Sequence, residues 1–310
     1  MKNNKLFAVA GYPVFHSKSP LIFNSLFSAM EIPGHYSRIS ARSGEEVFEM
    51  FEGLELSGIN VTSPLKSEIF ALTKTRDSSS AIIGGVNTLV NENGNIKGYN
   101  TDHSGVSESF VEENIDVKGK KCLVLGAESA GRAAAYALTR SGGDVSIINR
   151  TFKKAHILAG DMDCNAVVFE KLQSEIAGSD IFVSTISSGT EIIKAGWLRK
   201  DTIIFDAVYK SSILSKTASA AGCRIISGER WLLNQAIPAF RIFTGKDVIK
   251  KDKDKLSRIL RDHDRSSSGL ILMGKREPAE NIKNRLAGLI EDMEISIATG
   301  PEEIAAGEEN

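Results

Sequence analysis

The feature that most constrains the fold is a series of short apolar runs separated by helical stretches in the second half of the chain. Residues Lys121–Leu125 form such a run, and an alanine-rich helix is expected after it, over about 130–141. Further apolar runs follow at 144–149, 180–184 and 202–206. Short, continuously apolar strands are typical of parallel sheets that carry helices on both faces. The alternation therefore predicts βαβ units on a parallel sheet.

The first half of the chain has a mixed pattern, with polar loops after several expected strands. We expect strands at 6–10, 36–39 and 58–62 and a hairpin within 86–99, with helices from Ser19-Pro20 onward and over 45–54. A chain of 310 residues is long enough for two domains of ordinary size. The predicted fold class is therefore α/β, with two domains.

The C-terminal part has a different composition. Residues 229–243 are expected to form a helix that ends at Gly245, and a short strand is expected at 270–273. Between them, residues 246–265 are dense in charges of both signs, which predicts an exposed helix.

Charge and cysteine content narrow the class of partner. The formal net charge is −1, so no basic field points to nucleic acid or to an anionic membrane. The three cysteines have no C-x-x-C spacing, which argues against a disulfide framework and against a zinc site. The apolar run near the N-terminus is too short for a signal peptide or a membrane span. A cytoplasmic protein without a metal is the simplest interpretation.

A turn typical of dinucleotide-binding sites follows Lys121–Leu125. Gly126 and Gly131 occupy the first and last glycine positions of that fingerprint, and the helix beyond them would offer free N–H groups to a pyrophosphate. Glu128 replaces the middle glycine, where a side chain crowds the phosphates and a carboxylate repels them. A strand–turn–helix unit without a ligand has the same outline, so this turn alone leaves both alternatives open.

The next expected strand ends in a basic segment. Arg150 comes about 20 residues after the glycine turn and is followed by Lys153 and Lys154. In NAD enzymes an acidic residue near this point holds the ribose 2′-hydroxyl, whereas an arginine accommodates the 2′-phosphate of NADP. The segment favours NADP, although Arg150 could also simply begin a solvated loop.

Four loops in the first half are rich in hydroxyl and amide side chains. They cover residues 16–20, 60–66, 85–88 and 100–102. Such a lining suits a ligand with several hydroxyls and a carboxylate, and it could polarise a carbonyl. Ser, Asn, Pro and Gly are also common turn residues, so any one of these loops alone could be structural.

Together, these loops resemble those of the shikimate dehydrogenase family. The pattern G-x-P-x-x-H-S-x-S-P is present at Gly11–Pro20, and N-V-T-x-P-x-K is present at Asn60–Lys66. Further matches, in chain order, are G-x-x-N-T at 84–88, N-T-D at 100–102, N-R-T at 149–151, D-x-x-Y at 206–209 and G-x-x-x-L-x-x-Q-x-x-x-x-F-x-x-x-T-G at 228–245. The chain departs from the family at Glu128 and at Trp231, where methionine is usual.

The resemblance implies an NADPH-dependent enzyme that reduces 3-dehydroshikimate to shikimate in aromatic amino acid biosynthesis. Lys66 and Asp102 would form the catalytic pair, with lysine supplying a proton and positive charge to the developing alkoxide. The residues implied to bind substrate are Ser17, Ser19, Asn60, Thr62, Asn87, Tyr209 and Gln235. Those implied to bind NADP are Gly126, Ala127, Ser129, Ala130, Asn149, Arg150, Thr151 and Lys154. No metal is implied.

The expected fold is an N-terminal α/β substrate domain followed by a Rossmann-like cofactor domain with a parallel sheet. The substrate domain would cover residues 1–102 with a returning helix at 230–245, the cofactor domain 103–229, and an accessory segment 246–310. A small molecule is the expected partner, and the chain could be a monomer or a homodimer. Two alternatives stay open: a quinate/shikimate dehydrogenase, and a binding protein that kept the substrate pocket and lost the cofactor.

Overall fold

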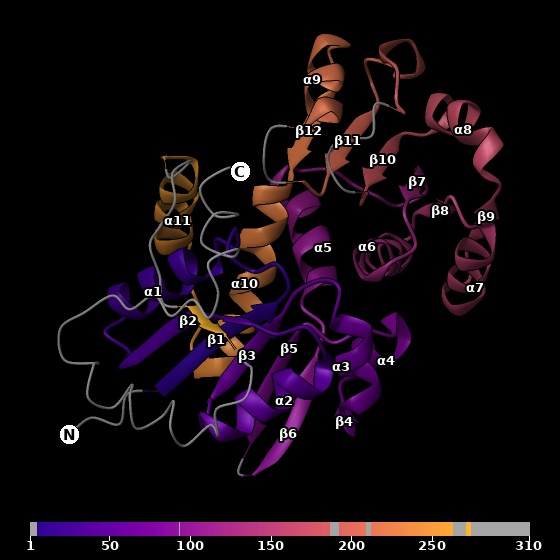
Figure 1. Cartoon of the computed structure of the whole chain (residues 1–310). Coiled ribbons are helices and arrows are strands. Elements are labelled where there is room, and N and C mark those ends of the chain that lie inside the picture. Colours follow the sequence, from indigo (N-terminus) through magenta and orange to yellow (C-terminus); the bar gives the residue numbers. More distant parts are fainter. Residues whose placement is uncertain (1–4, 93, 187–191, 209–211, 263–270, 274–310) are drawn as a thin grey trace, which may run out of the picture. The chain divides into compact units, whose positions relative to one another are not determined.

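The computed structural model describes residues 5–92, 94–186, 192–208, 212–262 and 271–273 (Figure 1). The described residues divide into two units. Unit 1 comprises those within 1–81, 85–100 and 239–310, and unit 2 comprises those within 82–84 and 101–238. Helix α10 (Gly228–Thr244) crosses from unit 2 to unit 1 after Pro238.

Unit 1 is built on one mixed sheet with the strand order β13-β2-β1-β3-β5-β6-β4. The strands are β1 (Lys5–Gly11), β2 (Gly34–Ser40), β3 (Gly58–Val61), β4 (Thr75–Arg76), β5 (Thr88–Glu92), β6 (Asn95–Tyr99) and β13 (Ile271–Met273). The helices are α1 (Ser19–Ala29), α2 (Gly44–Gly53), α3 (Lys66–Leu72), α11 (Lys250–Asp262) and the end of α10. The expected hairpin is confirmed, because β5 and β6 pair antiparallel.

Side chains that alternate along β1 divide the core of unit 1 into two parts. Ala8 and Ala10 belong to a cluster that includes apolar side chains of α2 and α3. Phe7 points to the other face, where its ring packs against Phe27 of α1 and Phe243 of α10. Because successive side chains of a strand point to opposite faces, β1 is buried on both sides.

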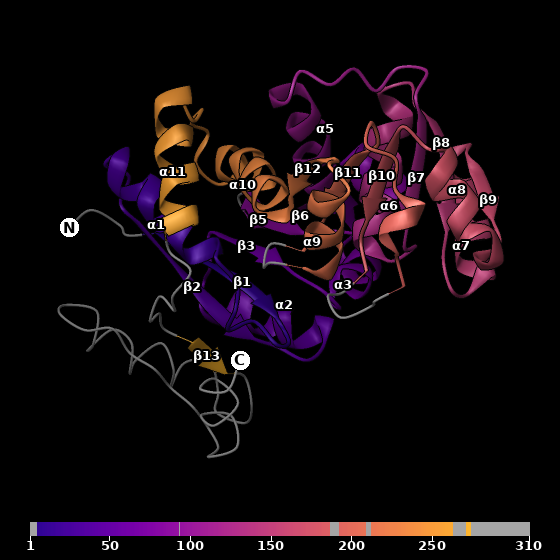
Figure 2. The same cartoon turned by 90° about the horizontal axis from the view of Figure 1, so that it is seen from above.

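The C-terminal residues of unit 1 correct one expectation. Helix α11 was expected to be exposed because of its many charges, but Leu256 and Leu260 are both buried. They lie four residues apart, on one face of the helix. Helix α11 lies beside α1 in both views (Figures 1 and 2). Strand β13 confirms the expected short strand and pairs parallel with Arg38–Ser40 of β2.

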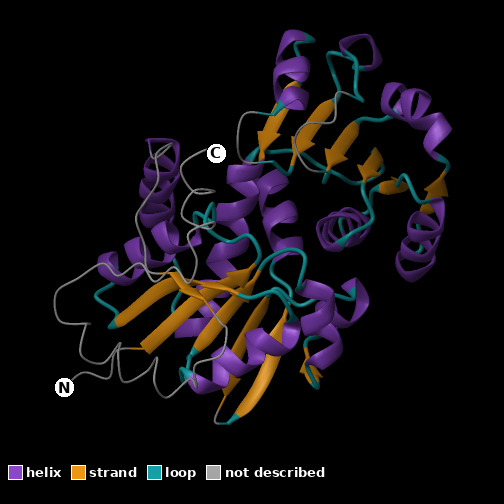
Figure 3. Ribbon diagram, viewed as in Figure 1, coloured by secondary structure: helices purple, strands orange, loops and turns teal. Residues whose placement is uncertain are grey.

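Unit 2 contains a fully parallel sheet with the order β12-β11-β10-β7-β8-β9, drawn in orange in Figure 3. The strands are β7 (Lys121–Leu125), β8 (Asp144–Ile148), β9 (Asn165–Val167), β10 (Ile181–Ser184), β11 (Ile203–Asp206) and β12 (Arg224–Ser227). The helices are α5 (Asp102–Glu112), α6 (Ser129–Arg140), α7 (Phe152–Met162), α8 (Leu172–Gly178), α9 (Ile213–Ala220) and most of α10, with short 3₁₀ turns at Phe169–Lys171 and Ala195–Trp197. Helix α4 (Ser78–Ile83) spans the boundary between the units.

Both faces of the unit 2 sheet are covered. Val124 of β7 belongs to a cluster with side chains of α5, α6 and α7, whereas Leu123 and Leu125 belong to a second cluster with side chains of α8 and α9. The continuously apolar run at Lys121–Leu125 therefore reflects burial on two sides, as the sequence predicted. The Rossmann-like arrangement expected from the sequence is confirmed.

Candidate active site

The polar loops of unit 1 meet at one edge of its sheet. Strands β1 and β3 are parallel and both end at this edge. Strand β5 runs antiparallel to β3, with Thr88 opposite Asn60, so β5 begins there. Strand β6 pairs with β5, with Tyr99 opposite Thr88, so β6 ends there. The motif loops at 16–20, 60–66, 84–88 and the start of 100–102 are thereby brought to one place.

A chain of hydrogen bonds runs through this edge. The Tyr36 hydroxyl donates to Asn60 Oδ1 at 2.6 Å. Asn60 Nδ2 donates to Thr88 Oγ1 at 2.9 Å and to the Asn87 carbonyl oxygen at 3.3 Å. The Thr88 hydroxyl donates to Asn87 Oδ1 at 2.9 Å. Asn60 thus contacts the Asn87 backbone directly and the Asn87 side chain through the Thr88 hydroxyl, so it helps to orient Asn87.

Ser17 and Ser19 are both buried at the end of the β1 loop. Their hydroxyls lie 3.2 Å apart, and the Ser19 backbone N–H donates to Ser17 Oγ at 3.3 Å. The buried Arg38 guanidinium donates to the Ser17 carbonyl oxygen from Nη2 at 2.7 Å and from Nε at 3.2 Å. The Arg38 guanidinium thus holds the backbone of this loop, and the loop presents two adjacent hydroxyls, which suit a carboxylate ligand.

Lys66 is the first residue of α3 and is only 9% exposed. Its carbonyl oxygen accepts from the Val86 N–H at 3.0 Å, which links the 60–66 and 84–88 loops. Thr62, also in this loop, donates its N–H to the Ala10 carbonyl oxygen at 2.8 Å. Lysine is rarely buried to this extent unless its ammonium is paired.

Asp102 lies in unit 2, as the first residue of α5, and is 6% exposed. Its carbonyl oxygen accepts from the Trp231 indole N–H at 2.9 Å. The neighbouring Thr101 hydroxyl donates to Gln235 Oε1 at 3.3 Å. The structure thus brings Gln235 beside the Asp102 segment within unit 2. Because Lys66 belongs to unit 1, its pairing with Asp102 stays a prediction, and Tyr209 lies outside the described residues.

Sequence analysis missed two residues of unit 1 that support the site. Tyr36 and Arg38 both lie on β2, and both are buried. Complete burial raises the pKa of Tyr36 well above its usual value, so the phenol stays a hydrogen-bond donor at neutral pH. Both residues lie in the segment 36–39 that was expected to be a strand. No pattern in the neighbouring sequence indicated which residues they contact.

The glycine turn of unit 2 follows β7, at the point where the strand order reverses. Strand β8 lies on one side of β7 and β10 on the other. Gly126 has φ +111°, and a Cβ there would lie 2.4 Å from Thr185 Oγ1. A Cβ on Gly131 would lie 2.0 Å from the Gly126 carbonyl oxygen. Both glycines are therefore required for the tight turn and for the approach of α6 to it, as in dinucleotide-binding turns.

The Glu128 side chain beyond this turn binds the next turn of unit 2 and does not cap α6. Glu128 stands at the N-cap of α6, but its side chain caps no N–H group of the helix. Instead its carboxylate forms an ion pair with Lys154 in the first turn of α7. Arg150 and Thr151 are exposed beside it, and Asn149 Nδ2 donates to the Thr151 carbonyl oxygen at 3.1 Å. The N–H groups of the first turn of α6 and this basic segment suit a pyrophosphate and a further phosphate.

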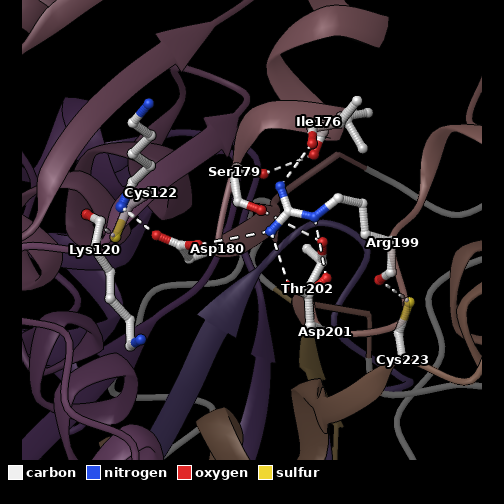
Figure 4. Close-up of polar contacts among 11 residues, drawn as sticks. Lys120, Cys122, Ile176, Ser179, Asp180, Arg199, Asp201, Thr202 and Cys223 are labelled. Atoms are coloured by element: carbon white, nitrogen blue, oxygen red, sulfur yellow. Dashed lines mark hydrogen bonds and ion pairs between the residues drawn. The ribbon is translucent and has the colours of Figure 1, made fainter.

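The opposite ends of the same strands carry a structural network (Figure 4). Arg199 binds Asp201 at 3.0 Å and Asp180 at 3.7 Å, near the starts of β10 and β11. Cys122 donates its thiol to the Lys120 carbonyl oxygen, and burial raises the pKa of Cys122 to about 12. A thiol with so high a pKa is a poor nucleophile. The Arg199 ion pairs link the segments that precede β10 and β11.

Among the residues that the structure describes, no group of three or more His, Cys, Asp or Glu side chains is arranged to hold a metal ion. None of the helices in the described ranges is long and apolar enough to cross a membrane.

A parallel sheet with a glycine turn at its switch point and a basic segment after the next strand defines the class of Rossmann-type dinucleotide-binding proteins. Comparison with known sequences narrows this class. The profile described as "Shikimate dehydrogenase substrate binding domain" matches residues 9–89, and "Shikimate / quinate 5-dehydrogenase" matches residues 109–206. A shikimate dehydrogenase (NADP⁺) of Methanococcoides burtonii is 36% identical over 262 residues, which cover 80% of this chain and 96% of the relative. The chain belongs to the shikimate dehydrogenase family.

Solved structures agree with this assignment. The crystal structure of shikimate dehydrogenase from Aquifex aeolicus matches with a TM-score of 0.78 and 35% identity, and the match covers 83% of this chain and 99% of that one. Shikimate 5-dehydrogenase from Thermus thermophilus, solved in complex with NADP(H) and shikimate, matches with a TM-score of 0.74 and 29% identity, over 83% and 99% of the two chains.

Proposed function

We propose that the chain is an NADP-dependent shikimate dehydrogenase that reversibly reduces 3-dehydroshikimate to shikimate in aromatic amino acid biosynthesis. The observation that carries the proposal is the convergence of the 16–20, 60–66 and 84–88 loops at one edge of the unit 1 sheet. Hydroxyls, an amide and a buried lysine at one edge suit a small ring acid with several hydroxyls. Unit 1 would bind this substrate, and unit 2 the cofactor.

The unit 2 turn fits a dinucleotide. Gly126 and Gly131 leave no side chain between the turn and α6, and Ala127 is small. The backbone N–H groups of Ser129 and Ala130 begin α6, where the helix dipole favours negative charge. We infer that this turn holds the pyrophosphate and that Asn149, Arg150, Thr151 and Lys154 face the adenosine half. Arginine without a nearby acid favours a 2′-phosphate, hence NADP.

The residues of the substrate site would act as follows. Ser17 and Ser19 would hold the ring carboxylate, while Thr62, Asn87, Gln235 and the unplaced Tyr209 would contact the ring or its substituents. The reduced nicotinamide supplies the hydride when bound. Lys66 would then donate a proton from Nζ to the ring oxygen and stabilise the negative charge that develops on it. Asp102 would orient the lysine ammonium and accept from a ring hydroxyl.

The two alternatives have different support. A quinate/shikimate dehydrogenase would act on a related ring acid, and the assay below decides between the two rings. A cofactor-poor binding protein is favoured only by Glu128, and that side chain is turned towards Lys154 and leaves the glycine contacts of the turn intact. A cytoplasmic location is supported by the free cysteines Cys122, Cys164 and Cys223.

A steady-state assay with four substrate pairs tests the proposal. Shikimate and quinate would each be oxidised with NADP⁺ or NAD⁺ while the reduced nicotinamide is followed by its absorbance. We expect the highest kcat/KM for shikimate with NADP⁺. A higher value for quinate would establish the first alternative, and binding of shikimate without turnover of either nicotinamide would establish the second.

A further inference from the structure

Glu128 and Lys154 form an ion pair between two neighbouring turns of unit 2. Glu128 precedes α6, which follows β7, and Lys154 lies in the first turn of α7, which follows β8. Strands β7 and β8 are paired, with Leu125 opposite Ile148, so the turns after them are adjacent. The carboxylate therefore lies between the proposed pyrophosphate turn and the proposed 2′-phosphate segment.

Lys154 stands where a helix favours an anion. The first turn of α7 contains Lys153 and Lys154 and no acidic residue. The N-terminus of a helix carries partial positive charge, so two lysines there are unfavourable unless an anion accompanies them. In this structure the accompanying anion is the Glu128 carboxylate. Such a local conflict between sequence and helix dipole is typical of a ligand site.

Glu128 has no evident role in stabilising its own turn. The Glu128 side chain is 75% exposed, that of Lys154 is 53% exposed, and the Glu128 carboxylate accepts no capping hydrogen bond from the N–H groups of α6. Exposed ion pairs of this kind contribute little to stability and exchange partners readily. A phosphate, with more charge and more acceptor atoms than a carboxylate, can displace one.

We infer that Glu128 is a specificity-determining residue, whose carboxylate competes with the 2′-phosphate of NADP for Lys154. Binding of NADP would require Lys154 to exchange the carboxylate for the phosphate, whereas binding of NAD would leave the ion pair intact. Glu128 therefore reduces the preference of the site for NADP over NAD. This inference rests on the proposed function, because it assumes that the cofactor lies across these two turns.

A double-mutant cycle tests the competition. The dissociation constants of NADP⁺ and NAD⁺ would be measured by titration calorimetry at low and high salt for the wild type, Glu128→Gln, Lys154→Met and the double variant. We expect Glu128→Gln to tighten NADP⁺ binding about two- to fivefold at low salt, as the loss of an exposed ion pair allows. The change for NAD⁺ should stay below twofold. In the Lys154→Met background the gain should vanish, and high salt should reduce it.

Asp144→Asn is the control, because Asp144 is exposed and begins β8, at the opposite end of that strand from both turns. It removes the same charge and should leave both dissociation constants unchanged. Equal gains for NADP⁺ and NAD⁺ on Glu128→Gln, or a gain that persists without Lys154, would overturn the competition and indicate simple repulsion of the cofactor phosphates. Failure of the wild type to bind either nucleotide would instead overturn the proposed function, and this inference with it.

Discussion

In the proposed unit 1 site, some residues would contact the ligand, and others would hold those residues in position. Asn60 would also hold its neighbours, because its amide accepts from Tyr36 and donates to Thr88 and to the Asn87 backbone, while its own contact with the substrate stays a prediction. Buried polar networks of this kind fix orientation when every member has a partner. If unit 1 binds the substrate as proposed, Tyr36 would position the site through Asn60 and Asn87.

Replacing Tyr36 by Phe should weaken substrate binding. The change removes the phenol hydroxyl that donates to Asn60 Oδ1, a buried oxygen. A hydrogen bond of this kind contributes about 0.5–1.5 kcal/mol, so we expect KM for shikimate to rise about two- to tenfold with a smaller change in kcat. Tyr99→Phe is the control, since the Tyr99 hydroxyl binds the exposed Glu92. Equal effects of the two substitutions would show that the Tyr36 bond does not position the site.

Replacing Lys66 by Ala should abolish most of the catalytic rate. The proposed general acid would be lost, and such groups typically contribute 10²–10⁴-fold, so kcat should fall by at least about that factor. Substrate affinity, measured by equilibrium titration, should change far less. A variant with nearly normal kcat would remove Lys66 from the mechanism.

Replacing Arg150 by Ala should weaken the binding of NADP⁺ more than the binding of NAD⁺, because only NADP⁺ carries the 2′-phosphate. A hydrogen bond to a charged group is worth about 1.5–3 kcal/mol, so the affinity for NADP⁺ should fall at least about tenfold. The dissociation constants of both nucleotides provide the measurement. Equal losses would mean that Arg150 does not contact that phosphate.

At the scale of secondary structure, helix α11 combines a charged sequence with a buried stripe. Its sequence is dominated by Lys, Asp and Arg, yet Leu256 and Leu260 are each only 2% exposed. Helix α11 contacts α1, the helix that follows the Ser17–Ser19 loop. The residues after the long α10 therefore contribute to the stability of unit 1.

Replacing Leu256 by Ala should destabilise unit 1. Truncation of a buried leucine typically costs about 2–5 kcal/mol. We expect the melting temperature of unit 1 to fall, as followed by calorimetry, and that of unit 2 to stay constant. Lys255→Ala, one position away and exposed, should leave both transitions unchanged. An unaltered melting profile for Leu256→Ala would show that α11 does not stabilise the unit.

The elements that sequence predicted best are those whose pattern is local. Strand β7 was expected at Lys121–Leu125 and has these bounds, because a strand buried on both faces needs a continuous apolar run. Charge density misled the prediction for α11, where two leucines four residues apart outweigh their charged neighbours. The bond from Tyr36 to Asn60 and the ion pair of Glu128 with Lys154 join residues 24 and 26 positions apart. Only the pairing of the strands brings such residues together.

For the molecule as a whole, function would require residues of both units. Lys66, Ser17 and Asn87 belong to unit 1, whereas Asp102, Gln235 and the glycine turn belong to unit 2. The motifs of the family alternate along the chain between these units, with α10 crossing from one to the other. The order of the motifs was apparent in the sequence. Substitution of each residue, followed by kinetic and binding measurements, tests its role.

The most direct test of the central claim is product analysis after incubation of the full chain with 3-dehydroshikimate and NADPH. Nuclear magnetic resonance would quantify the ring acid while absorbance follows the cofactor. We expect shikimate to form in an amount equal to the NADPH consumed, and Lys66→Ala to slow both changes together. If the full chain bound both compounds but left them unchanged, it would not catalyse the reduction of 3-dehydroshikimate.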